Sequence, residues 1–454
     1  MNNVRILVPA LVAAILAAPA MAGSRFPLHV SENGHYLQDS AGKPFFINGD
    51  SPWEMAFRLT KDEARQYLDT RARQGFNTLL VDAIPYTDWS DHLTETNREG
   101  EPPFLTTGDF STPNEAYFRH LGWLISEAES RGILMMIVAA DLGSIGKHFD
   151  GHDPLGGMWY AQYRSNGVQK CANYAQYLGR TFQSHPNIVW VLGGDRDPAD
   201  VIDHVRAMAR ALRETAPDHL ITYHAGAKSS SVFFHQEDWL ALNMSYGYAD
   251  PYTFVGQDYD KKPSKPAFLG ESGYEGETLD GRGGTPQRVR RQFYWSVLSG
   301  ACGHLYGSVN WKVNPDWKDW LDTPGVRSVV NFNALMNRYP WHTLTPAPAG
   351  AVIVAGAETA TTLALAAWSP ERDLAIVYMP TSRRITIDSI RLKEGLETVW
   401  YDPSSGKELP AAGRSLGLKS LAEFTPPALN SAGDADWVLL FRSRESGAQE
   451  HAAE

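Results

Sequence analysis

Eight short apolar runs alternate with helical patterns between Pro44 and Val309, and this alternation most constrains how the chain can fold. The runs are almost continuously apolar, as in the stretch from Leu134 to Val138, which is typical of parallel strands covered on both faces. Eight such strands predict a closed (β/α)8 barrel, and a doubly wound open sheet is the alternative. The predicted strands are 44–49, 77–82, 133–141, 187–193, 219–224, 240–246, 267–271 and 303–309.

Five of the segments between these strands are long enough for helices. The first is the best defined, because Thr60 and Glu63 have the spacing of a capping box and Gly75 provides a stop. The segments after the fifth and sixth strands have no clear helical pattern. The predicted helices are 60–74, 114–131, 167–184, 198–215 and 285–298.

The sequence changes character after Trp341. The stretch 345–350 is rich in Pro and Ala and has neither a helical nor a strand pattern, so we expect a domain boundary there. Short apolar runs separated by turn residues follow it, at 351–355, 361–368, 374–379, 384–390, 398–401 and 437–441. The expected fold class is therefore α/β, a (β/α)8 TIM barrel followed by a small all-β sandwich. The predicted segments are a signal peptide at 1–22, the barrel at 23–344, the sandwich at 345–444 and a flexible tail at 445–454.

Residues 1–22 have the three parts of a secretory signal peptide. Arg5 precedes the apolar run from Ile6 to Ala18, and Ala20-Met21-Ala22 is a small-x-small cleavage pattern. Cleavage near Ala22 predicts a soluble periplasmic or secreted protein. No later apolar run reaches the roughly 18 residues that a membrane span requires.

Charge and motifs exclude several other classes of protein. The net charge of −11 argues against a nucleic-acid partner. The chain has two cysteines, Cys171 and Cys302, outside any metal-binding spacing, and they are either two buried thiols or one disulfide. No P-loop, G-x-G-x-x-G or G-x-S-x-G motif is present, so we expect no cofactor and no metal.

The carboxyl ends of barrel strands are where reacting groups gather, because the βα loops converge there. Two of these ends carry the acids best placed for catalysis, Asp195 after the fourth strand and Glu271 after the seventh. These strands face each other across a barrel mouth, so the two carboxyl groups can flank a sugar ring. Hydrolysis of a glycosidic bond needs such a pair, and a separation of about 5 Å predicts retention of configuration, whereas roughly 6.5–9.5 Å predicts inversion.

Other strand ends supply candidate substrate contacts. Aromatic residues make up 11% of the chain, with 14 Trp, and those at strand ends are suited to stack on sugars, whereas those inside strands pack the core. Polar and charged contacts to sugar hydroxyls are predicted at Asp50, Asp82, Asp141, Arg196 and His224, and stacking at Trp53, Tyr246 and Trp311, with core packing as the alternative for these aromatic residues.

Four segments of the barrel region carry a resemblance to a known family. They are Gly49-Asp50-Ser51-Pro52-Trp53, the stretch from Tyr67 to Asn77, the stretch from Asn187 to Pro198 with its Gly-Gly-Asp-Arg-Asp block, and Phe268-Leu269-Gly270-Glu271. Together they resemble the apiosidase-like glycoside hydrolases, family 140, over most of Phe26 to Trp341. The stretch from Val399 to Gly406 resembles a β-sandwich domain that is named for collagen binding, a name that is not evidence for collagen.

The resemblance implies a (β/α)8 barrel and a retaining mechanism, with Asp195 as the acid/base and Glu271 as the nucleophile. Characterised members of the family cleave at apiose linked to galacturonic acid in pectin, in rhamnogalacturonan II. We therefore expect a monomeric enzyme that acts on a plant cell-wall oligosaccharide or polysaccharide. Another glycosidase on the same barrel, such as a pentofuranosidase, is one alternative, and a non-catalytic secreted carbohydrate-binding protein is the other.

Overall fold

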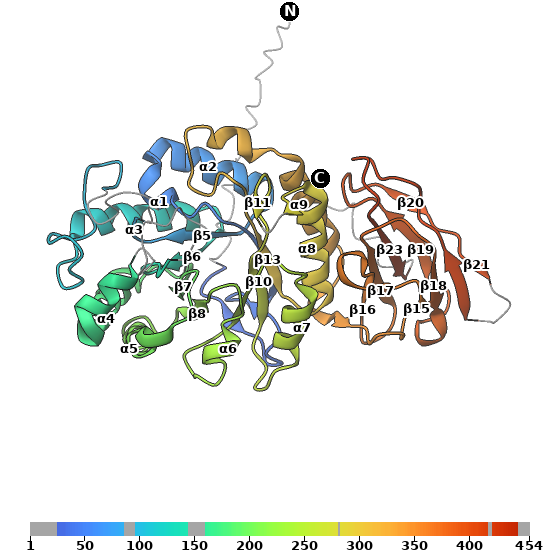
Figure 1. Cartoon of the computed structure of the whole chain (residues 1–454), viewed down its shortest axis with the longest axis horizontal. Helices are drawn as coiled ribbons and strands as arrows, with labels where there is room; N and C mark the ends of the chain where they lie inside the picture. Colours follow the sequence, from blue (N-terminus) through green and yellow to red (C-terminus); the bar gives the residue numbers. More distant parts are fainter. Residues whose placement is uncertain (1–24, 86–95, 144–158, 280–281, 416–419, 444–454) are drawn as a thin grey trace, which may run out of the picture.

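The computed structural model describes residues 25–85, 96–143, 159–279, 282–415 and 420–443. The predicted signal peptide at 1–22 and the predicted tail at 445–454 lie outside the described residues. Eight parallel strands form one sheet around the left half of Figure 1. In chain order they are β4 (Ile47–Asp50), β5 (Thr78–Asp82), β6 (Leu134–Val138), β7 (Ile188–Gly193), β8 (Leu220–His224), β9 (Asn243–Tyr246), β10 (Ala267–Glu271) and β13 (Gly303–Tyr306).

The sheet closes on itself. The last strand, β13, pairs in parallel with the first, β4, and aligns Tyr306 with Asp50. At the junction of β8 and β9, the Ala241 N–H donates to the Ile221 carbonyl at 2.9 Å, and the Thr222 hydroxyl donates to the Leu242 carbonyl at 2.8 Å. The structure therefore confirms the predicted barrel and excludes an open sheet.

Helices surround the barrel (Figure 1). The capping box of α2 is confirmed, because the Thr60 N–H donates to the Glu63 carboxylate and the Glu63 N–H donates to the Thr60 hydroxyl. The long helices are α2 (Lys61–Arg73), α3 (Glu115–Glu129), α4 (Tyr160–Phe182), α5 (Ile202–Thr215), α8 (Pro286–Leu298) and α9 (Pro324–Asn337), and the short ones are α1 (Met55–Arg58), α6 (Ser231–Phe234) and α7 (Tyr252–Asp260). None of the helices in the described ranges is both long and apolar enough to cross a membrane.

The helix predictions differ from the structure in three places. Helix α4 begins at Tyr160 and is interrupted at Gly167, where φ is +72°, so the predicted helix 167–184 corresponds to its second part and the first part was missed. The segments after the fifth and sixth strands, which lacked a helical pattern, contain α6 and α7. Helix α9 was missed, although its Thr323 N-cap followed by Pro324 is a start signal.

Two smaller sheets accompany the barrel. Strands β1 (His29–Val30), β2 (Leu37–Gln38) and β3 (Pro44–Phe45) form an antiparallel sheet just before the first barrel strand. Strands β11 (Thr278–Leu279) and β12 (Arg282–Gly283) form a hairpin after β10.

The two cysteines do not form a disulfide. Cys171 and Cys302 are both buried free thiols, which was one of the two alternatives that the sequence left open.

The C-terminal region is an all-β sandwich, as predicted. One sheet has the order β14 (Thr345–Pro346), β16 (Leu365–Trp368), β17 (Leu374–Met379), β23 (Trp437–Arg442), β19 (Glu397–Tyr401) and β20 (Glu408–Pro410). The other has the order β15 (Ile353–Ala355), β18 (Ile385–Asp388), β22 (Leu421–Phe424) and β21 (Arg414–Ser415). Val377, Leu439 and Ile387 lie in the core between the two sheets.

Helices α8 and α9 separate the barrel from the sandwich and pack against the latter (Figure 1). The rings of Tyr294 and Tyr378 stack with centroids 4.6 Å apart, and the buried Arg290 guanidinium bonds to the carboxylates of Asp436 and Asp434. Helices α8 and α9 and the sandwich therefore share one packed interface.

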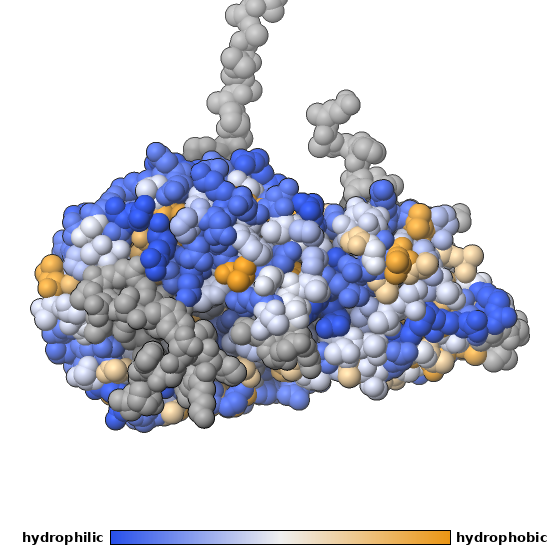
Figure 2. All heavy atoms as spheres, turned by 45° about the horizontal axis from the view of Figure 1, so that its top comes forward, coloured by the Kyte–Doolittle hydropathy of each residue, from blue (hydrophilic) through white to orange (hydrophobic). Residues whose placement is uncertain are grey.

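In Figure 2 the face turned forward is mostly hydrophilic, with apolar residues scattered over the sandwich.

Candidate active site

Asp195 and Glu271 meet at the carboxyl ends of the barrel strands. Glu271 is the last residue of β10, and Asp195 lies two residues beyond β7. Together with His224, the last residue of β8, each offers a side-chain oxygen or nitrogen, and these atoms all lie within 4.8 Å of one another. The pair that the sequence predicted is therefore brought together.

The backbone before Asp195 has an unusual conformation that fits this close approach. Gly193 and Gly194 have φ of +89° and +123°, and Asp195 itself has φ of +45°, a region that side-chain-bearing residues seldom occupy. A Cβ atom at Gly194 would overlap the carboxyl group of Asp141. Glycine at this position therefore lets the Asp195 loop lie directly against Asp141.

His224 connects the two acids. Its Nδ1 accepts a hydrogen bond from the Asp195 backbone N–H at 2.9 Å, and its Nε2 lies 2.8 Å from a Glu271 carboxylate oxygen. A backbone N–H can only donate, so Nδ1 carries no proton and Nε2–H donates to Glu271. Burial lowers the pKa of His224, which favours this neutral form.

Aromatic side chains complete the surroundings of the pair. The Tyr274 hydroxyl is bonded to Glu271 and accepts from the Trp53 indole N–H at 2.8 Å. The Tyr246 hydroxyl is bonded to Asp195 and lies 2.9 Å from the Tyr248 hydroxyl. Trp53 and Tyr246 both pack against the His224 ring, with centroids 5.5 and 5.0 Å away. These two predicted contacts thus lie at the acid pair.

The pKa values of both acids are raised. Burial, followed by the charge of Glu271, raises the pKa of Asp195 to about 6. Burial, followed by the charge of Glu277, raises the pKa of Glu271 to about 8. Acids this close titrate as a pair, so between these two values the pair holds one proton. Glu271 accepts from both His224 and Tyr274, and these two donors stabilise its charged form.

Asp82 and Asp141 form a second group of acids on the same face. Asp82 ends β5 and is 1% exposed, and neither of its carboxylate oxygens has a hydrogen-bond partner among the described residues. Asp141 accepts from the Gly143 N–H at 2.6 Å. Burial raises the pKa of both acids, and so do charges nearby: Asp141 acts on Asp82, and Asp195 acts on Asp141. Asp82 therefore presents unused acceptors beside the acid pair.

Three other predicted contacts are held differently. Asp50 is turned away from the acid pair toward α2, where its carboxylate accepts from Tyr67 at 2.5 Å and from Arg71 at 2.6 Å. The Arg196 guanidinium donates to the Gly143 carbonyl at 2.9 Å and lies 4.1 Å from the centre of the Tyr160 ring. Trp311 is half-buried and is hydrogen-bonded to Glu277. The structure thus brings Trp311 to the acids through Glu277, but it does not bring Asp50 there.

Sequence reasoning missed Tyr248 and Tyr274, and it assigned no catalytic role to Glu275 or Glu277. Glu277 is half-buried, and burial raises its pKa to about 7. Glu275 is buried in a structural role, since it accepts from the Tyr306 hydroxyl and from the Gly325 N–H at the start of α9. All four lie in loops after strands, where no periodic pattern marks which side chains turn inward. Their closeness to the ends of β9 and β10 was the one available signal.

Within the described residues, Asp195, His224 and Glu271 are also the one group of three side chains that could hold a metal ion. His224 already uses both ring nitrogens in hydrogen bonds to this same pair. The trio therefore fits acid–base chemistry by a held pair of carboxyl groups better than metal coordination.

Glycoside hydrolases are one class of enzyme that places an acid pair at the strand ends of a closed barrel. The chain is similar to a solved glycoside hydrolase family 5 protein from Bacteroides vulgatus ATCC 8482, at 24% identity and a TM-score of 0.78 over 95% of both chains. A second solved structure, named as a glycoside hydrolase, has the same identity and TM-score over 93% of this chain and 98% of its own. These likenesses show a shared fold.

The family follows from the sequence. The family model "Apiosidase-like, catalytic domain" matches residues 31–343, and the chain belongs to this family of glycoside hydrolases. A second model, "Putative collagen-binding domain of a collagenase", matches residues 347–442. No curated protein matches the chain.

Proposed function

We propose that this chain is a retaining glycosidase, with Glu271 as the nucleophile and Asp195 as the general acid and base. The observation that carries the proposal is that one carboxyl oxygen of Asp195 and one of Glu271 lie within 4.8 Å of each other at the ends of β7 and β10. Retaining glycosidases hold their two carboxyl groups about 5–5.5 Å apart, whereas inverting enzymes leave room for a water between them.

The reaction proceeds in two steps. Glu271 attacks the anomeric carbon as the bond to the leaving oxygen breaks, and Asp195 gives its proton to that oxygen. Asp195 then removes a proton from water, whose oxygen attacks the anomeric carbon and releases Glu271 as a carboxylate. The pair starts and ends with one proton, which matches the single proton that it holds between pH values of about 6 and 8.

His224 is a positioning residue in this mechanism. Its ring holds the Glu271 carboxylate through Nε2–H and the Asp195 backbone through Nδ1. Because both bonds require the same neutral tautomer, the ring fixes the spacing of the two acids and favours negative charge on Glu271. Tyr274, oriented by the Trp53 indole, adds a second donor to Glu271.

The sugar hydroxyl groups find acceptors at Asp82 and Asp141. A buried carboxyl group without a partner is costly unless a ligand bonds to it, and Asp82 is in that condition among the described residues. Substrate hydroxyls would supply the missing donors. Trp53, Tyr246 and Trp311 are proposed to provide stacking surfaces, and Arg196 to hold the loop that carries Gly143 and Asp141.

The family points to the substrate class. We propose a plant cell-wall polysaccharide, with the apiose–galacturonic acid linkage of pectin, in rhamnogalacturonan II, as the bond cleaved. On the sequence pattern of residues 1–22, we propose that the chain is exported and cleaved near Ala22, and that it acts in the periplasm or outside the cell. We propose separately that it acts as a monomer.

The test is hydrolysis of a panel of pectic and hemicellulosic oligosaccharides, with proton NMR of the anomer formed first. We expect release of apiose with its original anomeric configuration. Asp195→Asn should lower turnover about 10²–10⁴-fold, and Glu271→Gln should lower it at least as much. Asp197→Asn is the matched control, because its carboxylate bonds to Lys228 and not to the pair.

The outcomes separate the alternatives. Inversion of the first-formed anomer, or full activity in Asp195→Asn, would refute the assigned roles. Cleavage of a different pentofuranoside would keep the mechanism and replace the substrate. Sugar binding without turnover on any member of the panel would favour a carbohydrate-binding protein.

A further inference from the structure

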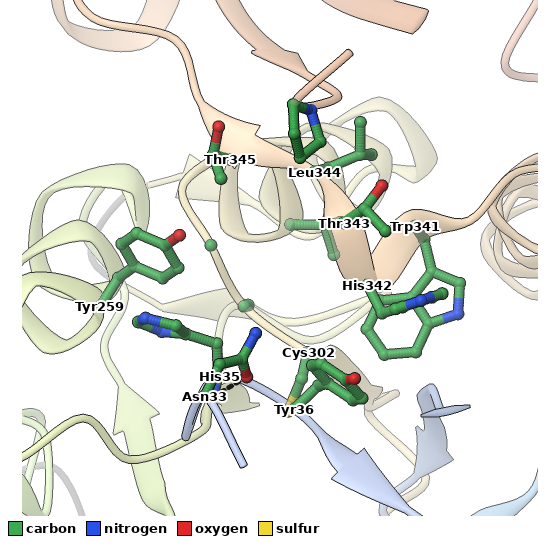
Figure 3. A pocket seen from close by; sticks show the side chains of 14 residues that line it. Asn33, His35, Tyr36, Tyr259, Cys302, Trp341, His342, Thr343, Leu344 and Thr345 are labelled. Atoms are coloured by element: carbon green, nitrogen blue, oxygen red, sulfur yellow. Dashed lines mark hydrogen bonds between the residues drawn. The ribbon is translucent and has the colours of Figure 1, made fainter. Parts of the chain in front are cut away.

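A cavity of about 380 Å³ lies at the end of the barrel opposite the acid pair (Figure 3). Its lining includes Ala301 and Cys302, which directly precede β13, whereas Glu271 ends the neighbouring strand β10. Its walls come from three parts of the chain: the loop before β2, the end of α7, and the segment that joins the barrel to the sandwich. The volume lies within the roughly 300–1,000 Å³ range of ligand pockets.

Aromatic rings line this cavity. His35 stacks on Tyr259, with ring centroids 4.3 Å apart. Tyr36 packs against His342 at 5.2 Å and against the edge of Trp341 at 6.1 Å. In Figure 3 the side chains of His35 and Tyr36 come from one loop and face those of Tyr259 and His342 from two other segments. Because these rings belong to separate segments of the chain, they present flat apolar surfaces on more than one side of the cavity.

The polar ends of these rings are available. Among the described residues, the Tyr36 and Tyr259 hydroxyls and the imidazole nitrogens of His35 and His342 have no hydrogen-bond partner. All four side chains are partly exposed, so they offer donors and acceptors at the rim of the cavity. Flat apolar faces combined with unused donors and acceptors suit a ligand that has both C–H faces and hydroxyl groups.

The cavity is also without formal charge. Its lining, all of it within the described chain, includes no Asp, Glu, Lys or Arg. Burial lowers the pKa of both His35 and His342, so both rings are neutral at neutral pH. Asp260 and Lys262 act on His35 from outside the lining with opposite signs. A phosphate or a uronate would find no cation here, so the chemistry favours a neutral ligand.

We propose that this cavity is a second carbohydrate-binding site, which takes one or two rings of a neutral saccharide and is separate from the site of hydrolysis. The choice of a saccharide rests on the proposed function, because an enzyme that cleaves a cell-wall polysaccharide gains from a second hold on it, here on neutral sugars and not on uronates. The site would increase the rate on long substrates and leave the rate on short ones unchanged.

The test separates binding from catalysis. Full-length Glu271→Gln, which removes turnover, is run by affinity electrophoresis through gels that contain arabinan, galactan, mannan or polygalacturonate. We expect retardation by at least one neutral polymer. Adding Tyr36→Ala or His342→Ala should weaken that retardation at least tenfold, whereas adding His29→Ala, an exposed histidine outside the cavity, should not.

A second pair of variants guards against misfolding. Tyr36→Phe and Tyr259→Phe keep the rings and remove only the two hydroxyls, and together they should also weaken retardation. In the active enzyme, the same two substitutions should lower the rate on a long pectic polysaccharide. They should leave kcat/KM unchanged on a short pectic oligosaccharide from the hydrolysis panel.

Retardation that is unchanged in the cavity variants would overturn the proposal. So would retardation by polygalacturonate alone, or by none of the neutral polymers. Absence of turnover on the short substrate by the unmodified chain would instead refute the proposed hydrolysis, and the binding assay would still decide on the cavity.

Discussion

Replacing Glu271 with Gln should stabilise the fold at alkaline pH while it removes activity. Burial raises the pKa of Glu271 from 4.5 to about 8. A carboxyl group with a higher pKa in the folded chain binds more protons when folded, so stability falls as the pH rises from about 4.5 to about 8. Above that range the folded chain bears the full cost of an ionised buried Glu271, and Gln does not bear it.

The size of the effect follows from the shift. One pKa unit corresponds to about 1.4 kcal/mol, so the raised pKa of Glu271 represents at most about 5 kcal/mol. Gln receives weaker hydrogen bonds from His224 and Tyr274, which costs about 1–2 kcal/mol at every pH. We therefore expect Glu271→Gln to be more stable than the unmodified chain by about 2–4 kcal/mol at pH 9, and slightly less stable at pH 4.

The assay is thermal unfolding at pH 4 and pH 9, at one scan rate, for the unmodified chain and two variants. Glu275→Gln is the matched control, because Glu275 is an equally buried acid four residues away. Its carboxylate accepts from Tyr306 at 2.6 Å, Thr323 at 2.5 Å and the Gly325 N–H at 2.8 Å. It should therefore lower the unfolding midpoint at both pH values. A lower midpoint for Glu271→Gln at pH 9 as well as at pH 4 would refute the reasoning.

Three further predictions concern pH, the glycine turn and the barrel–sandwich contact. The profile of kcat/KM against pH should be bell-shaped with limbs near 6 and 8, and a flat profile from pH 5 to pH 9 would contradict the shared proton. Gly194→Ala should lower kcat at least tenfold, because φ is +123° and a Cβ would displace Asp141; unchanged kcat would show that the loop can move freely. Arg290→Ala leaves the carboxylate of Asp436 buried without its cation and should destabilise the chain by about 3–5 kcal/mol in thermal or denaturant unfolding, whereas the adjacent Arg291→Ala should have a much smaller effect.

The barrel could be predicted because its pattern repeats. Each buried parallel strand needs a continuous apolar run, and a helix of the right length lies between most pairs of strands. The weak elements were those with little local signal: α6 has four residues and α7 has nine, and both depend on packing against the barrel for their stability. The short antiparallel strands β1 to β3 have two residues each and leave no periodic pattern at all.

Strand ends could be predicted as well, but not the face that each side chain takes. Asp50 and Asp82 both end a barrel strand, and in the sequence they look alike. A one-residue difference in register reverses the face of a strand residue. At β4 it is Gly49 that lies against Leu305, so Asp50 turns outward to Tyr67 and Arg71. Those two partners are four residues apart on α2, a spacing that places both on one face of a helix and could have suggested the contact.

His224 shows what a sequence alone leaves out. As a strand-end residue it was one polar candidate among several, and only the positions of its two nitrogens give it a role. Its Nδ1 accepts from a backbone N–H, so protonation of the ring would break the hydrogen bond that holds the Asp195 loop. Burial lowers the pKa of His224 below its ordinary value and keeps the ring neutral. The acidic limb of the activity profile should therefore come from the Asp195–Glu271 pair, because the imidazole that spaces the two acids stays neutral throughout that range.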